Sequence, residues 1–355
     1  VFNIAAFAAQ PDGKVIVGGY RFTPNGTYPF YRLNLDGSID PTFTAESTTP
    51  NGANSNVKSL VIQPDGKVIA VGSFEEINGQ PKKSLVRLMP NGSIDSTFTP
   101  NLTFTSAEIN KVLLKPNGKI VIQGRFTQIS PANAVLQLGP DGIAEWFQPI
   151  SQPVSDMAVQ ADGRVLVTGN FNNIGGVPVS NVGRINADGS VDASFAPPVF
   201  GTNPAGVAAV LPLSNGKILI GGDFRIVNGV TIPGGFARLN SDGRYDPSFL
   251  TTLDNNGSIY TMAMQRDGKI VFGGGFSGSH GVQRSNISRM LPLTRPKTSV
   301  ADFDGDGKTD LSIFRPIGAA SEWWWLKSGT GGNAALQFGA DSDKLAPVDF
   351  TGDGK

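Results

Sequence analysis

The segment ADFDGDGKTD, residues 301–310, concentrates carboxylates more densely than any other part of the chain. Its four acids are Asp302, Asp304, Asp306 and Asp310. Like charges at this spacing repel one another unless a cation lies between them. Calcium is bound by carboxylate and carbonyl oxygens, so we predict a Ca²⁺ site that is completed by the backbone carbonyl of Lys308. The alternative is an Asp/Gly turn without a metal, which leaves the repulsion unrelieved.

A second loop of the same kind begins 47 residues later with Asp349, Thr351 and Asp353. Thr351 stands where the first loop has its middle aspartate, so the second loop carries less charge. We predict calcium there too, with a weaker ligand set. An EF-hand is excluded for the first loop, because Ile313 occupies the position of the bidentate glutamate.

The composition excludes several classes of function. The chain has 29 basic and 29 acidic residues, one histidine and no cysteine. Thiol catalysis, disulfides and Cys/His zinc sites are therefore excluded. The sequence contains no run of basic residues that would indicate a nucleic-acid partner, and it contains no apolar stretch long enough to span a membrane. Because the chain begins Val-Phe-Asn and stops within a motif, DFTGDGK, we expect a fragment of a longer protein whose signal peptide lies outside this segment.

A repeated segment organises most of the sequence. QPDGKVIVGG at residue 10 returns in related form at residues 63, 115, 160, 213 and 265. The glycines of these turns are spaced 53, 52, 45, 53 and 52 residues apart. A period near 50 in a sequence made of strands predicts a propeller or a solenoid.

Each repeat has the same predicted local structure. A strand leads into Pro-Asp-Gly or a close variant, which predicts a tight hairpin turn with glycine in the left-handed conformation. A second strand, a looser connection, a third strand and a second turn of the DGSxD type follow. No helical period occurs in residues 1–295. We therefore predict an all-β fold, a β-propeller with six visible blades of the four-stranded type.

The blade count is left open between six and seven. The sixth repeat ends in SRMLPLTRPK and lacks the DGSxDxxF segment that completes the others. A propeller closes when a strand from one end completes the blade at the other end. An unclosed last blade could instead accept a strand from another chain.

A second periodic pattern joins arginine and aspartate. Arg32, Arg87, Arg184, Arg238 and Arg289 occupy matching positions in the third strands, and an aspartate follows eight residues after the first four: Asp40, Asp95, Asp192 and Asp246. In the third repeat both change together, to Gln137 and Glu145, which indicates contact. We predict a buried ion pair that fixes each blade. The alternative is a ring of arginines that binds an anionic ligand in a central channel.

Other candidate residues favour structural roles. Trp323, Trp324 and Trp325 lie in one predicted strand, so at least one indole faces away from the core and could stack on a sugar or another domain. His280 lies in a loop without a nucleophile motif nearby. The acids of the DGSxD turns are explained by Asx turns rather than by metal binding. We find no catalytic cluster and expect no enzyme activity.

The repeat QPDGKhhhGG…hxRLNxDGSxDxxF resembles the delta-60 repeat of large secreted and surface proteins of bacteria over residues 3–293. Kelch repeats rank second, because these units carry phenylalanine, as at Phe74 and Phe126, where kelch has tryptophan. The aspartate loop with the following TDLSIFRP…WWWLKSGTG resembles an FG-GAP or VCBS-type calcium repeat over residues 299–347. These resemblances imply two domains, 1–295 and 296–355, the second of them truncated.

We expect a non-enzymatic structural or adhesive protein of the bacterial cell surface, stabilised by calcium, which could assemble into a filament or a surface layer. Repetition without a unique site favours this role. The alternative is a secreted propeller module that binds a glycan or a protein on one face, because the loops between the second and third strands vary. The resemblances imply an extracellular location.

Overall fold

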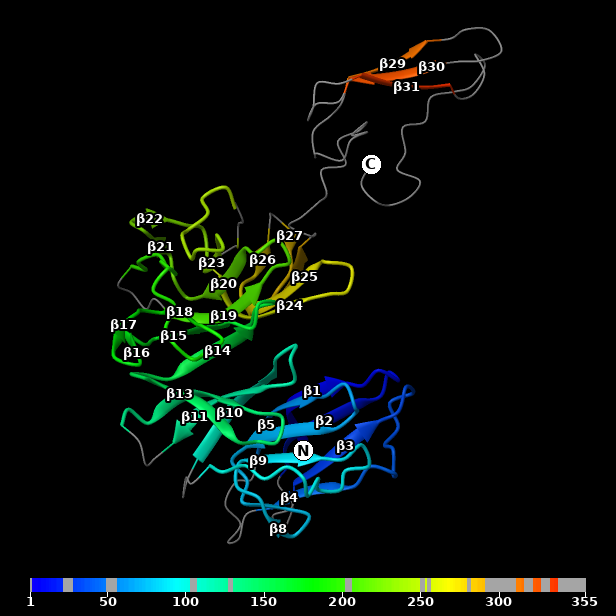
Figure 1. The fold of residues 1–355 in the computed structure, drawn as a ribbon, viewed down its shortest axis with the longest axis vertical. Coiled ribbons are helices and arrows are strands. Elements are labelled where there is room, and N and C mark those ends of the chain that lie inside the picture. The colour runs from blue at the N-terminus through cyan, green and yellow to red at the C-terminus, as the bar shows by residue number, and fades with distance from the viewer. Residues whose placement is uncertain are drawn as a thin grey trace. The chain divides into compact units, whose positions relative to one another are not determined.

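All regular elements of the described residues are β-strands (Figure 1). The computed structural model describes residues 2–21, 28–48, 56–102, 107–126, 130–201, 206–249, 253, 257–279, 282–290, 311–315, 322–326 and 333–337. The predicted all-β class is confirmed over these residues, in which no helix occurs. None of them therefore forms an apolar helix that could cross a membrane.

Six repeats follow one another, and each contains three antiparallel strands. Repeats 1 to 3 consist of β1 (Phe2–Ala9), β2 (Val15–Arg21) and β3 (Tyr28–Leu33); β5 (Val57–Ile62), β6 (Val68–Gly72) and β9 (Leu85–Leu88); and β10 (Ala107–Leu114), β11 (Ile120–Phe126) and β12 (Asn133–Leu138). Repeats 4 to 6 consist of β14 (Val154–Val159), β15 (Val165–Gly169) and β18 (Val182–Ile185); β19 (Val207–Pro212), β20 (Ile218–Gly222) and β23 (Phe236–Leu239); and β24 (Ser258–Met264), β25 (Ile270–Gly275) and β28 (Ile287–Met290).

The first turn of each repeat has the predicted hairpin geometry. In the second repeat the Gln63 amide donates to the Lys67 carbonyl at 2.8 Å. Gly66 has φ of 81°, a left-handed conformation that glycine adopts without steric cost. The Asp65 carboxylate accepts a hydrogen bond from the Lys67 amide at 3.1 Å, which locks the turn. This turn sets the register of the first two strands.

The fourth strand that we predicted for each blade is confirmed in the first and third repeats. β4 (Ala45–Thr48) pairs with β3, and β13 (Ala144–Ile150) pairs with β12. The equivalent segments of the fourth and fifth repeats each make one bridge to the hairpin of the next repeat, Phe200 with Val227 and Leu253 with Ser279. In the second and fifth repeats part of this segment, residues 103–106 and 250–252, lies outside the described residues.

Each of repeats 2, 4, 5 and 6 also has a hairpin of two-residue strands: β7 (Glu76–Ile77) with β8 (Gln80–Pro81), β16 (Asn173–Ile174) with β17 (Val177–Pro178), β21 (Ile226–Val227) with β22 (Val230–Thr231), and β26 (Gly278–Ser279) with β27 (Val282–Gln283). The first two hairpins extend the sheets of the preceding repeats, because β7 pairs with β4 and β16 pairs with β13, whereas the last two form separate two-stranded sheets.

The hydrophobic core is divided into layers that lie between successive repeats. All five residues of β6 are buried, because both faces of this strand are covered. Val68 and Ala70 belong to the layer shared with the first repeat. Ile69 and Val71, which point the other way, belong to the layer shared with the third repeat. Alternation along a strand therefore connects three consecutive repeats.

The first strands of neighbouring repeats lie next to one another. β5 packs against β1 and β10, and β19 packs against β14 and β24. These strands form the inner side of the array, and the two-residue hairpins form its outer side. The third strands, which carry the arginines, are separated from the inner side by one strand.

The chain divides into two compact units, one of residues 1–264 and 271–289 and one of residues 265–270 and 290–355. In the second unit, β29 (Leu311–Arg315), β30 (Glu322–Leu326) and β31 (Asn333–Gln337) form an antiparallel sheet. The strand predicted to contain Trp323, Trp324 and Trp325 is thus confirmed as β30. Trp324 of β30 lies opposite Ile313. The predicted domain boundary near residue 295 lies outside the described residues.

Candidate functional site

The predicted calcium ligands lie outside the residues that the structure describes. These are Asp302, Asp304, Asp306, Lys308, Asp310, Asp349, Thr351 and Asp353, and His280 is outside as well. Within the described ranges, no group of three or more His, Cys, Asp or Glu side chains is placed to hold a metal ion. Among the described residues, we therefore examine the polar arrangement that recurs from repeat to repeat, the arginine–aspartate pair.

The second repeat shows this arrangement fully. Arg87 is 7% exposed and Asp95 is 4% exposed, and Arg87 Nε donates to Asp95 Oδ2 at 2.8 Å. Arg87 Nη2 donates to the hydroxyl of Thr97 at 3.1 Å, and Nη1 donates to the carbonyl of Pro140 in the third repeat. The guanidinium lies 4.7 Å from the ring centroid of Phe98, a cation–π geometry. We call this set of contacts the arginine clasp.

Asp95 is held in its charged form by the groups around it. Burial alone would raise its pKa, but the hydroxyl and amide of Thr97, Lys67 and Arg87 hold the pKa of this carboxyl well below its usual range. Lys67 Nζ lies 3.0 Å from Asp95 Oδ2. The buried charge of Asp95 is thus compensated by two cations, Lys67 and Arg87, and by two hydrogen bonds from Thr97. The clasp therefore stabilises the fold through the whole set of contacts rather than through one ion pair.

The same clasp recurs in three other repeats, which confirms the predicted contact between arginine and aspartate. The Nε–Oδ2 distances are 2.9 Å for Arg32 and Asp40, 2.7 Å for Arg184 and Asp192, and 2.8 Å for Arg238 and Asp246. In each repeat a phenylalanine lies under the guanidinium, at Phe43, Phe195 and Phe249. In the sixth repeat, Arg289 is exposed and no aspartate follows it.

In the third repeat, glutamine, glutamate and tryptophan side chains replace the arginine clasp. Gln137 Nε2 donates to Glu145 Oε2 at 2.6 Å, as the joint change in the sequence indicated. Glutamine cannot reach the next repeat, and Trp146 takes over this contact: its indole Nε1 donates to the carbonyl of Ala187 at 3.2 Å. Ala187 occupies in the fourth repeat the turn position that Pro140 occupies in the third. Burial lowers the pKa of Lys115, whose ammonium lies over the Trp146 ring.

Three of the four clasps, those of Arg32, Arg87 and Arg184, join one repeat to the following one. Arg32 Nη1 donates to the Pro90 carbonyl at 2.7 Å, and Arg184 Nη1 donates to the Ser241 carbonyl. In Arg32 and Arg87 all three guanidinium nitrogens donate to protein acceptors. The arginines lie on third strands, away from the inner side. This geometry supports the structural interpretation over a ring that binds an anionic ligand.

The inner strands are linked by a second set of polar contacts. Lys58 pairs with Glu108, and Lys111 pairs with Asp156, each pair joining consecutive repeats. The other oxygen of Asp156 accepts a hydrogen bond from the Val210 amide at 2.9 Å. Val210 lies in β19, the end strand of its sheet, and alternate amides of an end strand have no partner within the sheet, so a side chain of the preceding repeat satisfies this one.

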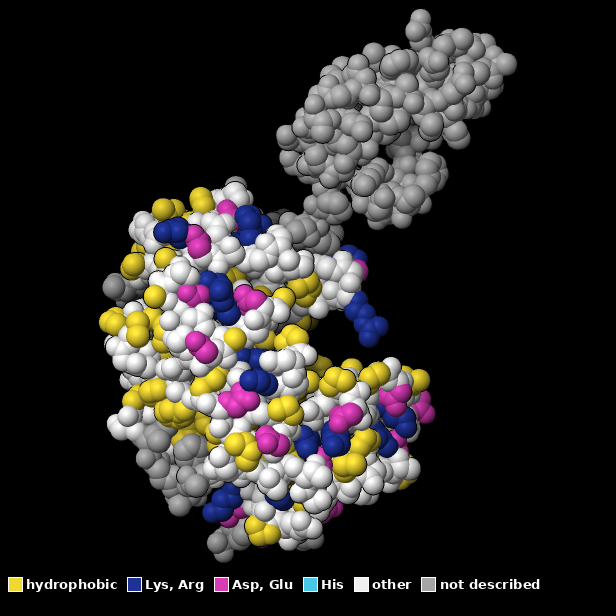
Figure 2. All heavy atoms as spheres, in the orientation of Figure 1, with side chains coloured by type: hydrophobic (Ala, Val, Ile, Leu, Met, Phe, Trp, Pro, Cys, Tyr) yellow, Lys and Arg dark blue, Asp and Glu magenta, His cyan; other side chains and the backbone are white. Residues whose placement is uncertain are grey.

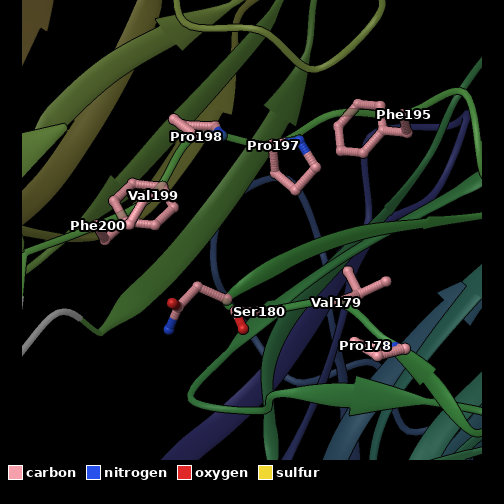
Figure 3. A pocket seen from close by; sticks show the side chains of 9 residues that line it. Pro178, Val179, Ser180, Phe195, Pro197, Pro198, Val199 and Phe200 are labelled. Carbon is pink, nitrogen blue, oxygen red and sulfur yellow. The ribbon is translucent and has the colours of Figure 1, made fainter. Parts of the chain in front are cut away.

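A cleft of about 440 Å³ is lined by residues of the fourth repeat and of the segment that follows it. Figure 3 shows Phe195 and Pro197 on one side of the cleft and Val179 and Pro178 on the other. Ser180 and Asn181 supply polar groups to the same lining. Apolar walls with a few polar groups are typical of sites for ligands or short peptide segments.

Two groups of functional residues were not anticipated from the sequence. The lysine that follows the first turn in most repeats reaches the clasp carboxylate, as Lys14, Lys119 and Lys217 do at 2.6, 2.8 and 2.6 Å. Its regular occurrence after Asp-Gly or Asn-Gly was a visible signal. The role of Trp146 had no periodic signal, because it occurs in one repeat only.

Distant similarity to solved structures was found. The chain is similar to a protein of unknown function from Bacteroides caccae (16% identity, TM-score 0.41, covering 69% of this chain and 80% of that one). It is also similar to PorZ, a bacterial surface component of the type-IX secretion system of Porphyromonas gingivalis (12%, 0.40, 95% and 51%). A third is XC5397 from Xanthomonas campestris, a gluconolactonase (13%, 0.40, 81% and 92%). Similarity this low carries no argument about function.

No curated protein matches the chain. Six segments match the family described as "Domain of unknown function (DUF5122) beta-propeller": residues 10–43, 63–98, 115–142, 160–195, 213–249 and 265–292. Each match contains the first turn and the position of the clasp arginine, which is Gln137 in the third repeat and Arg289 in the sixth. The matches cover more than half of the chain, so the protein belongs to this β-propeller repeat family.

Proposed function

We propose that the protein is a non-enzymatic structural or adhesive β-propeller of the bacterial cell surface, with six blades of the delta-60 type followed by calcium-binding repeats of the FG-GAP or VCBS type. The observation that carries this proposal is the repetition of the arginine clasp. A contact repeated with nearly the same distances in successive repeats serves a scaffold, whereas a binding or catalytic site uses residues that differ from their equivalents.

Calcium is proposed as the stabiliser of the repeats that follow the propeller. Asp302, Asp304, Asp306 and Asp310, with the Lys308 carbonyl, form an all-oxygen donor set that fits this hard cation. Asp349, Thr351 and Asp353 form a weaker second set. Binding to the folded state alone raises its stability by mass action. The propeller repeats, which are held by clasps, do not depend on the ion in this proposal.

Calorimetry in calcium and in EGTA tests the proposal. We expect the unfolding transition of the C-terminal repeats to rise by several degrees in calcium, while the propeller transition stays in place. The double substitution Asp304→Asn and Asp306→Asn removes the calcium effect. The matched control Asp141→Asn, at an exposed turn aspartate, leaves the calcium effect intact. Equal melting curves in calcium and in EGTA would refute the calcium part of the proposal.

Protease shaving of intact source cells tests the surface location.

A second candidate function is the binding of a glycan or a protein partner. The observation in its favour is the cleft between Val179 and Phe195, whose aromatic and proline walls suit a sugar face or an extended peptide. A glycan array and a peptide display screen, each run with the wild type and with Phe195→Ala and Val199→Asp variants, test this alternative. Binding that both variants abolish would favour a ligand-binding module over a structural one.

A further inference from the structure

In the first and third repeats, the fourth strand fills the space between the third strand of its own repeat and the outer hairpin of the next one. β4 pairs with β3 on one side and with β7 on the other. β13 joins β12 to β16 in the same way. The fourth strand thus closes the outer rim between two successive repeats.

The equivalent segment of the fourth repeat keeps the contact with the next hairpin but leaves the third strand. The Val199 amide donates to Asn228 Oδ1 at 2.9 Å, and the Val199 carbonyl accepts from the Asn228 amide at 2.8 Å. Glu46 makes the same two contacts with Asn78 in the first repeat. Glu46 also lies opposite Pro29 in the ladder with β3. In the fourth repeat, β18 is the end strand of a three-stranded sheet, and no described strand pairs with it on this side.

The sequence explains why the two strands separate. Val199 follows the clasp aspartate of its repeat by seven residues, whereas Glu46 follows its own by six. The fourth repeat therefore has one residue more between the clasp and the hairpin contact. The same segment contains Pro197 and Pro198, which have no amide N–H and cannot donate to a ladder.

The third strand of the fourth repeat is also shorter at this point. β3 and β12 begin four residues before the clasp position, whereas β18 begins two residues before it. Asn181, the residue before β18, has φ of 63°, a left-handed conformation that ends the extended strand. Tyr28 and Ser47 pair in the first repeat, but their counterparts Ser180 and Phe200 line the cleft instead (Figure 3). The cleft thus occupies the place where the third and fourth strands pair elsewhere.

One side of the cleft presents the edge of an extended segment. The backbone of Val199 and the amide of Gly201 bind the outer hairpin, the latter by donating to the Ile226 carbonyl at 3.1 Å. Successive residues of an extended segment direct their N–H and C=O groups to opposite sides. Those of Phe200 therefore point away from the hairpin, and they make no hydrogen bond within the part of the chain that the structure describes. An unpaired edge of this kind can accept another strand.

The lining of the cleft suits a peptide better than a sugar. None of its nine residues carries a charge. The Phe195 ring lies 4.5 Å below the Arg184 guanidinium and contacts Gly243 of the fifth repeat. The Phe200 ring packs on Phe224, with centroids 5.0 Å apart. Stacking on a sugar requires an open aromatic face, and both lining phenylalanines are buried.

Exposed apolar side chains continue from the cleft onto the outer hairpins. Val199 is 75% exposed, and Val177 of β17 is 42% exposed. Val230, at the position of Val177 in the fifth repeat, is 55% exposed. Figure 2 shows hydrophobic side chains gathered at the edge of the molecule where Figure 1 labels β16 and β17. Apolar side chains of an added strand would find contacts on this surface.

We propose that the cleft binds an extended, uncharged segment of a partner protein, which adds to the Phe200 edge as a strand. Its backbone would pair with the amide and carbonyl of Phe200, and its apolar side chains would pack on Pro197 and Val179. The ladders of the first and third repeats identify the occupant, because the chain itself fills the same place there with a strand. This inference rests on the second candidate function and names its partner as a peptide.

Calorimetric titration of the full chain with a synthetic peptide tests the proposal. The probe is WFQPIS, the sequence of residues 146–151, which includes most of β13; it is blocked at both ends and carries no charge. We expect saturable binding. Val199→Asp places a charge on the uncharged wall and should raise the dissociation constant by about tenfold or more. The control Val230→Asp changes an exposed valine outside the lining and should leave the dissociation constant unchanged.

A second variant closes the cleft without adding a charge. Deletion of Pro198 together with Pro197→Ala restores the spacing of the first repeat and removes both prolines, so the chain's own segment can fill the space. We expect this variant to lose peptide binding while its Tm stays at or above that of the wild type. Peptide binding that survives in a variant with such a Tm would contradict the proposal.

Hydrogen exchange separates strand addition from other modes of binding. The Phe200 amide should exchange about tenfold more slowly or less in the complex, because it donates to the added strand. Peptide binding that leaves this amide unchanged overturns the proposal. So does the absence of Val199-dependent binding by WFQPIS and by every member of a displayed library of random octapeptides. If glycans then bind in a Val199-dependent way, the second candidate function stands without this inference; if they do not, both fall.

Discussion

The second and sixth repeats contain the same three strands and the same first turn, yet they differ in what surrounds them. In the second repeat both sheet faces are covered, Arg87 is buried and Leu85 lies in a core layer. In the sixth repeat the equivalents Arg289 and Ile287 are exposed. Local sequence therefore builds the sheet, whereas the neighbouring repeat supplies most of the burial. Matched substitutions at equivalent positions can measure this difference.

The largest difference is expected at the clasp arginine. Arg87→Leu leaves Asp95 buried with only Lys67 as a cation, and we expect a loss of about 3 kcal/mol in the free energy of unfolding. Arg289→Leu, at the exposed equivalent, should change it by less than about 0.5 kcal/mol. Urea unfolding of both variants measures the pair. Equal losses would show that the clasp contributes nothing specific to the second repeat.

The apolar position two residues before the arginine comes next. Leu85→Ala opens a cavity in a layer shared by two repeats and should cost about 2.5 kcal/mol. Ile287→Ala removes a side chain that is exposed in the single chain and should cost about 0.5 kcal/mol or less. The same unfolding experiment at a concentration where the chain is monomeric checks both values. A large cost for Ile287→Ala would indicate that its face is covered.

A smaller contrast separates the second turns of the first and second repeats. Gly92 and Gly37 have φ of 90° and 81°, so alanine strains both turns by about 1 kcal/mol. At Gly92 the new Cβ would also lie 2.5 Å from the Thr44 carbonyl oxygen, which adds about 2 kcal/mol. Thermal unfolding of the two alanine variants should therefore give a clearly lower Tm for Gly92→Ala. If Gly37→Ala is as harmful, the turn of the first repeat is covered after all.

The smallest effect is expected in the pH dependence of the free energy of unfolding. The pKa of Asp95 lies well below its usual range in the folded protein, and an unfolded aspartate titrates near pH 4. The stabilisation by this carboxylate is therefore complete above about pH 4 and is lost as the pH falls toward its folded pKa. Asp95→Asn should flatten the decline below pH 4. If the free energy of unfolding of Asp95→Asn declines below pH 4 as steeply as that of the wild type, other groups dominate the acid dependence.

Much of this architecture could be predicted because it is written in local, repeated patterns. The Pro-Asp-Gly turns, the β-branched strands and the eight-residue spacing from Arg87 to Asp95 each depend on neighbours in the chain, so periodicity makes them visible. The joint change to Gln137 and Glu145 was enough to indicate their contact. The fourth strand predicted for each blade is confirmed as β4 and β13 in the first and third repeats, and in the second repeat the equivalent segment lies partly outside the described residues.

The sequence alone was sufficient for the all-β class, the repeat and the pairing of arginine with aspartate, because these depend on hydrogen bonds and side chains a few residues apart. It could not show that Arg32 reaches Pro90, that Trp146 replaces an arginine, or that Phe7 and Ile287 stay exposed. Those contacts join residues from different repeats, and the exposure of a side chain depends on what packs against it. Only the packing of one sheet on the next determines them, since burial is a property of the surroundings rather than of the residue.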